Sequence, residues 1–450
     1  MLIRNVLVWR RAVLSLAALA VLAWAHQAWA GGFGRSSAVG GVVVTAEGVL
    51  RNPEVDELNQ LKKIRAEILR QLPGTLKQAV PLRKISLRRL QETIQTRIDK
   101  VQMPYLTEEM QYLGGLTRIK YIFIYPEEND IVLAGPAEPI TVDGRGHMVG
   151  AETGSPILQL DHLLVALRSA ESAAQNPISC SIDPTPEGLA RFQAYWRKQK
   201  VFSPRLAKGV EKALGPQRVT LTGVSPKTDF ARTMVAADFR MKRLAMGLEP
   251  SGIRGLPSYL SMISGGGLNS ATPRWWMAPN YDRMLKSPDG TAWELRGGGI
   301  KVMTEDSFVT ETGGPKRTGK SSPAAQKWAD AMTSHFDELS HRHAIFGEMR
   351  NVMDMAVIGA LIVKERLADQ ANCDLSLLMD ESKISTEGFN VPKTVNTIAS
   401  VKKSGRKYII SASGGVEVSS WHVADRVQAS ESLAPVRKDA QHQGAHWWWN

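Results

Sequence analysis

Residues 118–134, with the sequence RIKYIFIYPEENDIVLA, decide the class of the fold. Arg118–Tyr125 is rich in the aromatic and β-branched residues that favour strands. Pro126–Asp130 has the composition of a turn, and Ile131–Ala134 is a second apolar run. The stretch therefore predicts two strands joined by a turn. Because amphipathic helices are predicted on both sides of it, the sequence indicates an α+β fold.

The segment before this hairpin is predicted to be helical and basic. A helix is predicted to begin at Pro53, with apolar residues at helical spacing up to Leu72. A second helix is predicted over Ser86–Val101. We therefore assign residues 53–112 to a basic helical segment, and residues 31–52 to a Gly-rich leader with a short β start.

Four further segments follow the basic one. Residues 113–256 alternate predicted strands and helices, which indicates a mixed α/β middle. Residues 257–385 are predicted to form β-hairpins followed by a long helical pair. A C-terminal β-meander is predicted over residues 386–427, with one of its turns at Gly414-Gly415. Residues 428–450 are a tail.

The first 30 residues have the organisation of an export signal. Three arginines precede an apolar run over Ala12–Trp24, and Ala28-Trp29-Ala30 has the small-x-small pattern that signal peptidase recognises. The run is too short to cross a bilayer. The mature protein is therefore predicted to begin near Gly31, to have no transmembrane helix, and to act in the periplasm, at the cell surface or outside the cell. Arg10-Arg11 leaves the Sec and twin-arginine routes both open.

The positive charge of the chain is concentrated in the basic segment. The net charge is +12, and between Gln60 and Lys100 eleven basic residues face three acidic ones. Such helices attract anionic polymers or lipid head groups, although a solvated helix face has the same composition. Nucleic acid is not expected as a partner outside the cytoplasm. The candidate anion-binding residues are Lys62, Lys63, Arg65, Arg70, Arg83, Lys84, Arg88 and Arg89.

Two smaller groups of residues are candidates for a site or a covalent link. Glu338 and His341 lie three apart on a predicted helix near His335, a spacing that suits one metal ion but also an ordinary polar helix end. Cys180 and Cys373 are the only cysteines, and in an oxidising compartment they form either one disulfide or two buried thiols.

Two further patterns concern anions. Gly314–Ser321 matches the phosphate-loop pattern GxxxxGK[ST], but the residues before it are too polar for the buried strand that this motif needs. We therefore interpret it as an exposed basic loop. The second pattern is a predicted charged helix together with the residues that follow its C-terminal end. These residues form either a pocket or a solvated face with local ion pairs. The pocket candidates are Asp238, Arg240, Glu249 and Arg254.

The middle of the chain resembles a family of uncharacterised secreted bacterial proteins, a domain of unknown function expanded as paralogues in planctomycete-type bacteria. The resemblance implies export and a shared fold, but no reaction, no cofactor and no functional residues. The stretches that carry it are YIFIYPE (121–127), DIVLAGPAE (130–138), CSIDPTPEG (180–188), MVAADFRMKRLAMGLEP (234–250), PRWW (273–276) and AQKWAD (325–330).

These observations favour an exported, non-enzymatic protein of the envelope or the extracellular space. Its expected partner is an anionic envelope component or polysaccharide, bound through the basic helices. The alternative is a hydrolase that acts on an extracellular polymer or peptide. That alternative predicts a concave pocket that holds titratable groups with perturbed pKa values. It fails if no pocket collects any of Asp238, Arg240, Glu249, Arg254, His335 and His341.

Overall fold

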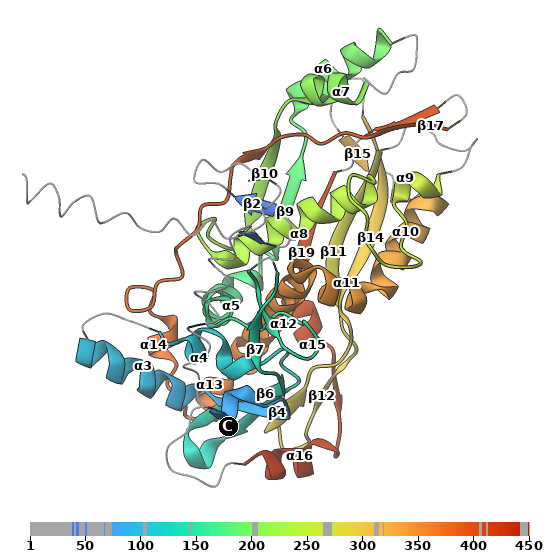
Figure 1. Ribbon diagram of the computed structural model, residues 1–450. Coiled ribbons are helices and arrows are strands. Elements are labelled where there is room, and N and C mark those ends of the chain that lie inside the picture. Colours follow the sequence, from blue (N-terminus) through green and yellow to red (C-terminus); the bar gives the residue numbers. More distant parts are fainter. Residues whose placement is uncertain are drawn as a thin grey trace, which may run out of the picture. The chain divides into compact units, whose positions relative to one another are not determined.

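The computed structural model describes residues 38–39, 42–44, 50–51, 67, 74–101, 106–144, 146–199, 206–263, 272–309, 315–317, 319–404, 407–410, 413–441 and 449. The predicted signal peptide and nearly all of the first predicted basic helix lie outside these residues. The fold is α+β, as the sequence predicts (Figure 1). Among the described helices, none combines the length and the apolar character that crossing a bilayer requires.

The predicted hairpin of residues 118–134 is confirmed and belongs to a six-stranded sheet. β5 (Tyr121–Tyr125) pairs antiparallel with β6 (Asp130–Ala137), so that Phe123 lies opposite Val132. The turn between them is the short helix η3 (Pro126–Glu128), which ends at Asn129 in the left-handed conformation. The strand order is β20 (Val427–Ala429), β12 (Met284–Lys286), β13 (Ala292–Glu294), β5, β6 and β4 (Val80–Ser86).

A seven-stranded sheet collects strands from three of the predicted segments. β19 (Ser413–Val418) lies at its centre, parallel to β11 (Thr272–Asn280) and antiparallel to β9 (Ile178–Asp183). The mixed middle and the segments that follow it therefore share one sheet. Outward from these strands lie β14 (Gly299–Val309) and β15 (Pro315–Arg317) on one side, and β10 (Gln217–Thr222) and β16 (Thr394–Val395) on the other.

One helix, α12 (Ala344–Lys364), runs through the core. Every residue from Ala344 to Ile362 is buried, although Glu348, Arg350 and Asp354 are charged. It packs against α5 (Leu160–Ala173) and α8 (Asp229–Ala245). Buried charges need partners. We therefore expect the charged residues of this helix to form ion pairs and hydrogen bonds with the elements packed around it.

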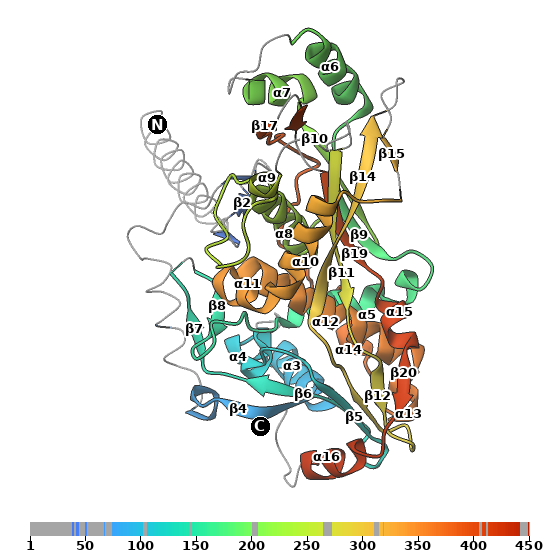
Figure 2. The same cartoon turned by 90° about the vertical axis from the view of Figure 1, so that its right-hand side faces the viewer.

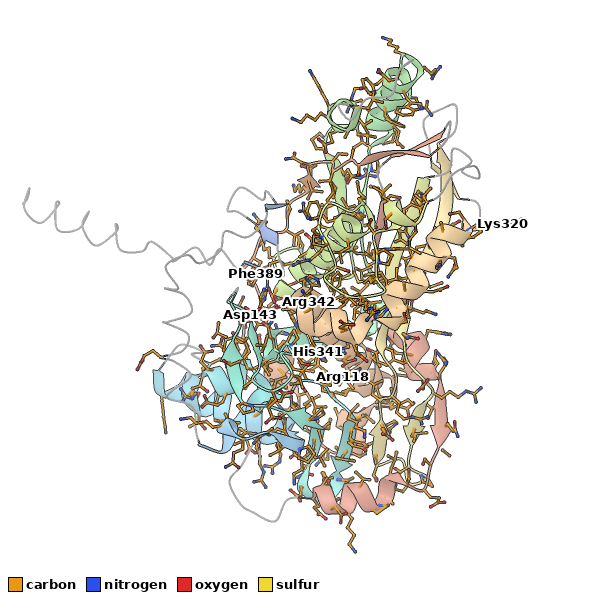
Figure 3. All side chains as sticks on the ribbon, turned by 45° about the vertical axis from the view of Figure 1, so that its right-hand side comes forward. Arg118, Asp143, Lys320, His341, Arg342 and Phe389 are labelled. Atoms are coloured by element: carbon orange, nitrogen blue, oxygen red, sulfur yellow. The ribbon has the colours of Figure 1, made fainter. Side chains whose placement is uncertain are left out.

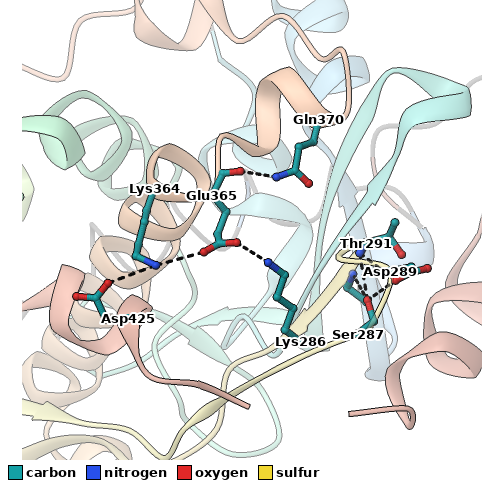
Figure 4. A network of polar contacts seen from close by, with 9 residues as sticks. Lys286, Ser287, Asp289, Thr291, Lys364, Glu365, Gln370 and Asp425 are labelled. Carbon is teal, nitrogen blue, oxygen red and sulfur yellow. Dashed lines mark hydrogen bonds and ion pairs between the residues drawn. The ribbon is translucent and has the colours of Figure 1, made fainter. Parts of the chain in front are cut away.

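The C-terminal end of α12 is tied to a strand and to a second helix by ion pairs (Figure 4). The Lys286 Nζ of β12 donates to Glu365 at 2.6 Å. The Lys364 Nζ lies 3.2 Å from Glu365 and 3.3 Å from Asp425, the last residue of α15 (Ser420–Asp425). This network joins the six-stranded sheet to the central helix.

The structure differs from the predicted C-terminal β-meander. β17 (Val401–Ser404) and β18 (Lys407–Ile410) pair only with each other among the described strands. Gly414 and Gly415, predicted to form a turn, lie inside β19. A Cβ atom on Gly414 would come within 2.0 Å of the Trp275 carbonyl oxygen. These glycines therefore permit close approach of neighbouring strands rather than a change of direction.

The described part of the basic segment contains a strand in addition to the predicted helix. The helix expected over Ser86–Val101 is confirmed as α3 (Leu87–Val101), but the residues before it form strand β4. The remaining described elements are β1 (Ala38–Val39), β2 (Val42–Val44), β3 (Leu50–Arg51), η1 (Gly74–Lys77), α4 (Glu108–Gln111), η2 (Leu113–Gly115), β7 (Ile140–Val142), β8 (Met148–Gly150), α6 (Pro186–Arg197), α7 (Leu206–Leu214), α9 (Tyr259–Met262), α10 (Pro323–Ser334), α11 (Phe336–Arg342), α13 (Leu367–Gln370), α14 (Ser376–Met379) and α16 (Leu433–Ala440).

Candidate functional site

The loop that follows α8, residues 247–258, brings several predicted candidates together. Glu249 lies just beyond the helix end, and its two carboxylate oxygens are shared between two arginines of the last turns. Arg240 Nε donates to Glu249 Oε1 at 2.7 Å, and Arg243 Nε donates to Oε2 at 2.9 Å. The carboxylate thus fixes the start of the loop against the helix that precedes it.

The other side of this loop packs against α11 and its neighbours, about 90 residues further along the chain. The His343 Nε2 donates to the Ser251 carbonyl oxygen at 2.7 Å. Arg342 lies against Gly252, where a Cβ atom would be only 2.2 Å from its Nε. Gly252 also has a φ of +70°, which favours glycine. The loop therefore contacts two groups of basic residues that are far apart in sequence. One group is Arg240 and Arg243, and the other is Arg342 and His343.

A cavity of about 610 Å³ opens along the loop 247–258. Its apolar wall includes the buried side chains of Leu244, Leu256 and Trp328. Arg254 lines it, is exposed, and makes no hydrogen bond or ion pair within the part of the chain that the structure describes. Around it, Glu249 is already neutralised by Arg240 and Arg243, so the rim carries an excess of positive charge.

The predicted pocket residues are therefore split between two faces of α8. Glu249 and Arg254 line the cavity, and Arg240 reaches it through Glu249. Asp238 faces the seven-stranded sheet instead, where the Lys242 Nζ donates to Asp238 at 3.0 Å and to the Ile182 carbonyl oxygen at 2.9 Å. Burial raises the pKa of Asp238 to about 6, although Lys242 opposes this shift.

A buried charge centre at the first turns of α8 was missed in the sequence. Asp229 accepts hydrogen bonds from Arg232 and from His162 of α5, the latter at 2.9 Å. Although burial opposes it, Arg232 and His162 together lower the pKa of Asp229. The Phe389 ring, labelled in Figure 3, lies 4.6 Å from the Arg232 guanidinium. The Asp229-Arg232 spacing was visible in the sequence, but His162 lies 67 residues away.

A second histidine–carboxylate pair lies in the same region. His147 Nδ1 is 2.8 Å from Glu348 of α12, and both side chains are buried. Burial would raise the pKa of Glu348, but His147 and the charge of Arg232 lower it. Asp143, also labelled in Figure 3, accepts the His147 backbone N–H. These contacts join the β7–β8 hairpin to α12, and none of these residues lines the cavity beside Arg254.

The metal candidates lie on and beside α11. His335 Nδ1 is 3.5 Å from Glu338, and His341 is exposed near the helix end (Figure 3). Within the described ranges, no three His, Cys, Asp or Glu side chains form a group that could hold a metal ion. His335 instead packs beside Gly255 of the cavity loop.

Four of the eight anion-binding candidates of the basic segment lie among the described residues, and each of these four has a partner within the protein. Lys62, Lys63, Arg65 and Arg70 lie outside the described residues. Arg83 is buried, with its guanidinium 5.4 Å from the centre of the Trp449 ring. Lys84 is half-buried, and burial lowers its pKa. Arg88 pairs with Glu92 at 2.6 Å and Arg89 with Glu128 at 3.7 Å.

Both cysteines are buried free thiols. Burial raises the pKa of Cys373 to about 12 and raises that of Cys180 well above its ordinary value. Cys180 lies on β9 beside Asp238, whereas Cys373 lies after α13 near Asp130. The disulfide that the sequence left open is thus not formed in the structure.

The residues of the phosphate-loop pattern do not follow a buried parallel strand. β15 (Pro315–Arg317) is an edge strand that pairs antiparallel with β14, and the Gly319 N–H donates to the Glu305 carboxylate at 2.8 Å. A carboxylate at this backbone N–H occupies the place that a phosphate would need.

The comparisons with known proteins identify one domain. Residues 180–259 match the model of the DUF1598 family, which is described as "Protein of unknown function (DUF1598)". The matched range runs from β9 to the start of α9, so it contains α8 and the cavity loop. No curated protein and no solved structure matches the chain.

Proposed function

We propose that the chain is an exported, non-enzymatic protein that binds an anionic ligand, and that Arg254 receives the negative group of this ligand. The observation that carries the proposal is the open cavity beside loop 247–258, with Arg254 exposed in it and without a carboxylate partner in the described residues. Arg342 lies against the same loop at Gly252.

The chemistry of the rim supports an oxyanion as the bound group. A guanidinium presents a planar set of N–H donors that matches a carboxylate, a phosphate or a sulfate. Leu244, Leu256 and Trp328 displace water from one side of the cavity. Charge pairing beside such an apolar wall is screened less than on an open surface.

The same geometry favours binding over hydrolysis. Both oxygens of Glu249 accept arginine N–H groups, so this carboxylate is not placed to exchange a proton with a substrate. Asp238 faces the opposite side of α8. The hydrolase alternative stays a prediction: the cavity collects Glu249 and Arg254, as that alternative expects, but Glu249 is engaged by two arginines.

Export is the second part of the proposal and rests on residues 1–30, together with the resemblance to secreted proteins of planctomycete-type bacteria. The periplasm, the cell surface and the extracellular space all fit it. In each of these places an acidic polysaccharide or another anionic envelope component would supply the ligand.

Calorimetric titration of the mature protein with galacturonate, inorganic phosphate and inorganic sulfate tests the cavity. At least one of these anions should bind, and Arg254→Ala should weaken its binding about tenfold, because a charge-assisted hydrogen bond is lost. Arg283→Ala is the matched control, since Arg283 is also an exposed arginine outside the cavity lining. Equal binding by the two variants, or no binding of any anion by the mature protein, would contradict the proposal.

A further inference from the structure

The connection between β9 and β10 is far longer than the two strands need. They are antiparallel neighbours, and the register places Arg218 directly opposite Asp183. A two-residue turn suffices to join such strands. The chain instead places residues 184–217 between these two positions, and the described part of this connection contains helices α6 and α7. Figures 1 and 2 show both helices together beyond the same end of the seven-stranded sheet.

The inserted helices form a small, well-built unit. Leu189, Val210 and Leu214 bury a cluster with Ala399 that is separate from the main core. Arg191 donates to the carbonyl oxygens of Ala213 and Leu214 and so satisfies the end of α7. Because this cluster is separate from the main core, stabilising that core does not account for the insertion.

The outer surface of the two helices is basic. Arg197 and Lys198 at the end of α6, and Lys208 and Lys212 on α7, are all exposed. None of these four side chains has a hydrogen bond or ion pair within the described residues. The Glu211 carboxylate accepts a hydrogen bond of 3.0 Å from the Ala399 backbone N–H. Glu187 is the other acidic residue of the two helices.

Aromatic rings lie on the same unit. The rings of Phe192 and Trp196 are 6.1 Å apart on successive turns of α6, and both side chains are only half-buried. An aromatic ring offers a flat apolar face with which the apolar face of a sugar ring can stack. Cations beside half-exposed rings are therefore complementary to a polymer that carries both negative charge and sugar rings.

We propose that helices α6 (Pro186–Arg197) and α7 (Leu206–Leu214) form a docking surface for an acidic polysaccharide. Arg197, Lys198, Lys208 and Lys212 attract the carboxylate or sulfate groups, and Trp196 contacts a sugar ring. This surface is independent of the cavity beside Arg254, because no residue of α6 or α7 lines that cavity.

The test is co-sedimentation and titration of the mature protein with polygalacturonate, with neutral dextran and with phosphatidylglycerol vesicles. Polygalacturonate should bind at low salt and be released by salt. The double variant Lys208→Glu/Lys212→Glu should bind at least about tenfold more weakly. The charge-matched control, Arg283→Glu/Lys438→Glu, changes two exposed cations outside this unit and should bind like the parent.

Two further variants separate docking from folding. Trp196→Ala should weaken binding without changing its salt dependence, because no charge is removed. A chain with Asn-Gly in place of residues 184–217 should keep a cooperative unfolding transition and lose the binding. Arg254→Ala should bind polygalacturonate like the parent, so the two proposals can fail separately. Equal binding by the glutamate variant and its control, or binding to vesicles but not to polygalacturonate, would overturn the proposal.

Discussion

At the scale of single residues, the cavity loop depends on glycine at position 252. Its positive φ is one constraint, and the 2.2 Å that would separate a Cβ atom at this position from Arg342 Nε is a second, separate one. Gly319 has nearly the same φ, +68°, but nothing within 4 Å of the place where its Cβ would lie. The pair therefore allows the cost of backbone strain to be separated from the cost of displacing the arginine.

We expect Gly252→Ala to lower the free energy of unfolding by about 2 kcal/mol, and Gly319→Ala by about 1 kcal/mol. Both variants introduce strain at a positive φ, but only the first also displaces Arg342. Urea unfolding measures the free energies, and titration with the small anions measures the effect on the cavity. If both variants lost the same stability and bound the anions unchanged, the contact between Arg342 and Gly252 would contribute neither to stability nor to anion binding.

Asp238 gives the stability of the protein a pH dependence of unusual sign. Burial raises its pKa to about 6. Between about pH 4 and about pH 6 the native state therefore keeps a proton that the unfolded state has released. The stabilisation is complete below this window and is lost as the pH rises through 6. Asp229 and Glu348 have lowered pKa values and act in the opposite direction, at more acidic pH.

We expect the free energy of unfolding to fall between about pH 4 and about pH 6, and Asp238→Asn to remove this fall. The amide is isosteric with the carboxylate but does not titrate. Urea unfolding at a series of pH values in this window measures the slope. A variant that is less stable overall but has the same slope as the parent would assign the pH dependence to another group.

At the scale of elements, α12 is held to both large sheets through one carboxylate. The Asp354 oxygens accept two hydrogen bonds of 2.8 Å from Arg118, which precedes β5, and one of 2.6 Å from the Tyr281 hydroxyl. Tyr281 follows β11, the strand beside the centre of the other sheet. Asp354 itself is fully buried.

We expect Asp354→Ala to lower the free energy of unfolding by about 3 kcal/mol. This is the lower end for breaking a buried ion pair, because the Arg118 side chain is 25% exposed and can regain some water. Chemical denaturation measures the change. The control is Asp369→Ala, which removes an ion pair with Arg366 that is exposed on both sides and should change stability little. Similar losses in the two variants would argue against the anchoring role of Asp354.

The elements that the sequence predicts well are those set by local rules. The two strands of residues 118–134 follow from strand-forming residues on both sides of a turn, and α3 follows from the helical spacing of its apolar residues. The turn predicted at Gly414 and Gly415 was wrong, because glycine is needed there for a non-local reason. The neighbouring strands leave no room for a Cβ atom at either position.

The contacts of the candidate site also divide into local ones, which the sequence can predict, and long-range ones, which it cannot. Arg240, Arg243 and Glu249 lie within ten residues, so their meeting could be predicted from helical spacing. The approach of Arg342 and His343 to the same loop, and the pairing of His147 with Glu348, join residues separated by about 90 to about 200 positions. No periodicity in a single sequence encodes such contacts.

At the scale of the whole molecule, β19 is the central strand of the seven-stranded sheet, and we expect the sheet not to form without it. It lies between β9 and β11 and contributes the central ladder of backbone hydrogen bonds. A mature chain that ends at residue 412 should therefore show no cooperative thermal unfolding transition. A chain that ends at residue 441, which keeps all the described helices and β19, should retain it. Calorimetry distinguishes the two, and a cooperative transition in the shorter chain would show that β9 and β11 can pair without β19.

The central place of β19 also sets an order in time. Synthesis proceeds from the N-terminus, so β9 and β11 leave the ribosome long before the strand that lies between them. Until residue 418 has emerged, each of them exposes an unpaired edge, which is a hazard for aggregation. The nascent chain must therefore be kept from pairing with other chains until β19, in the last tenth of the sequence, has been translated.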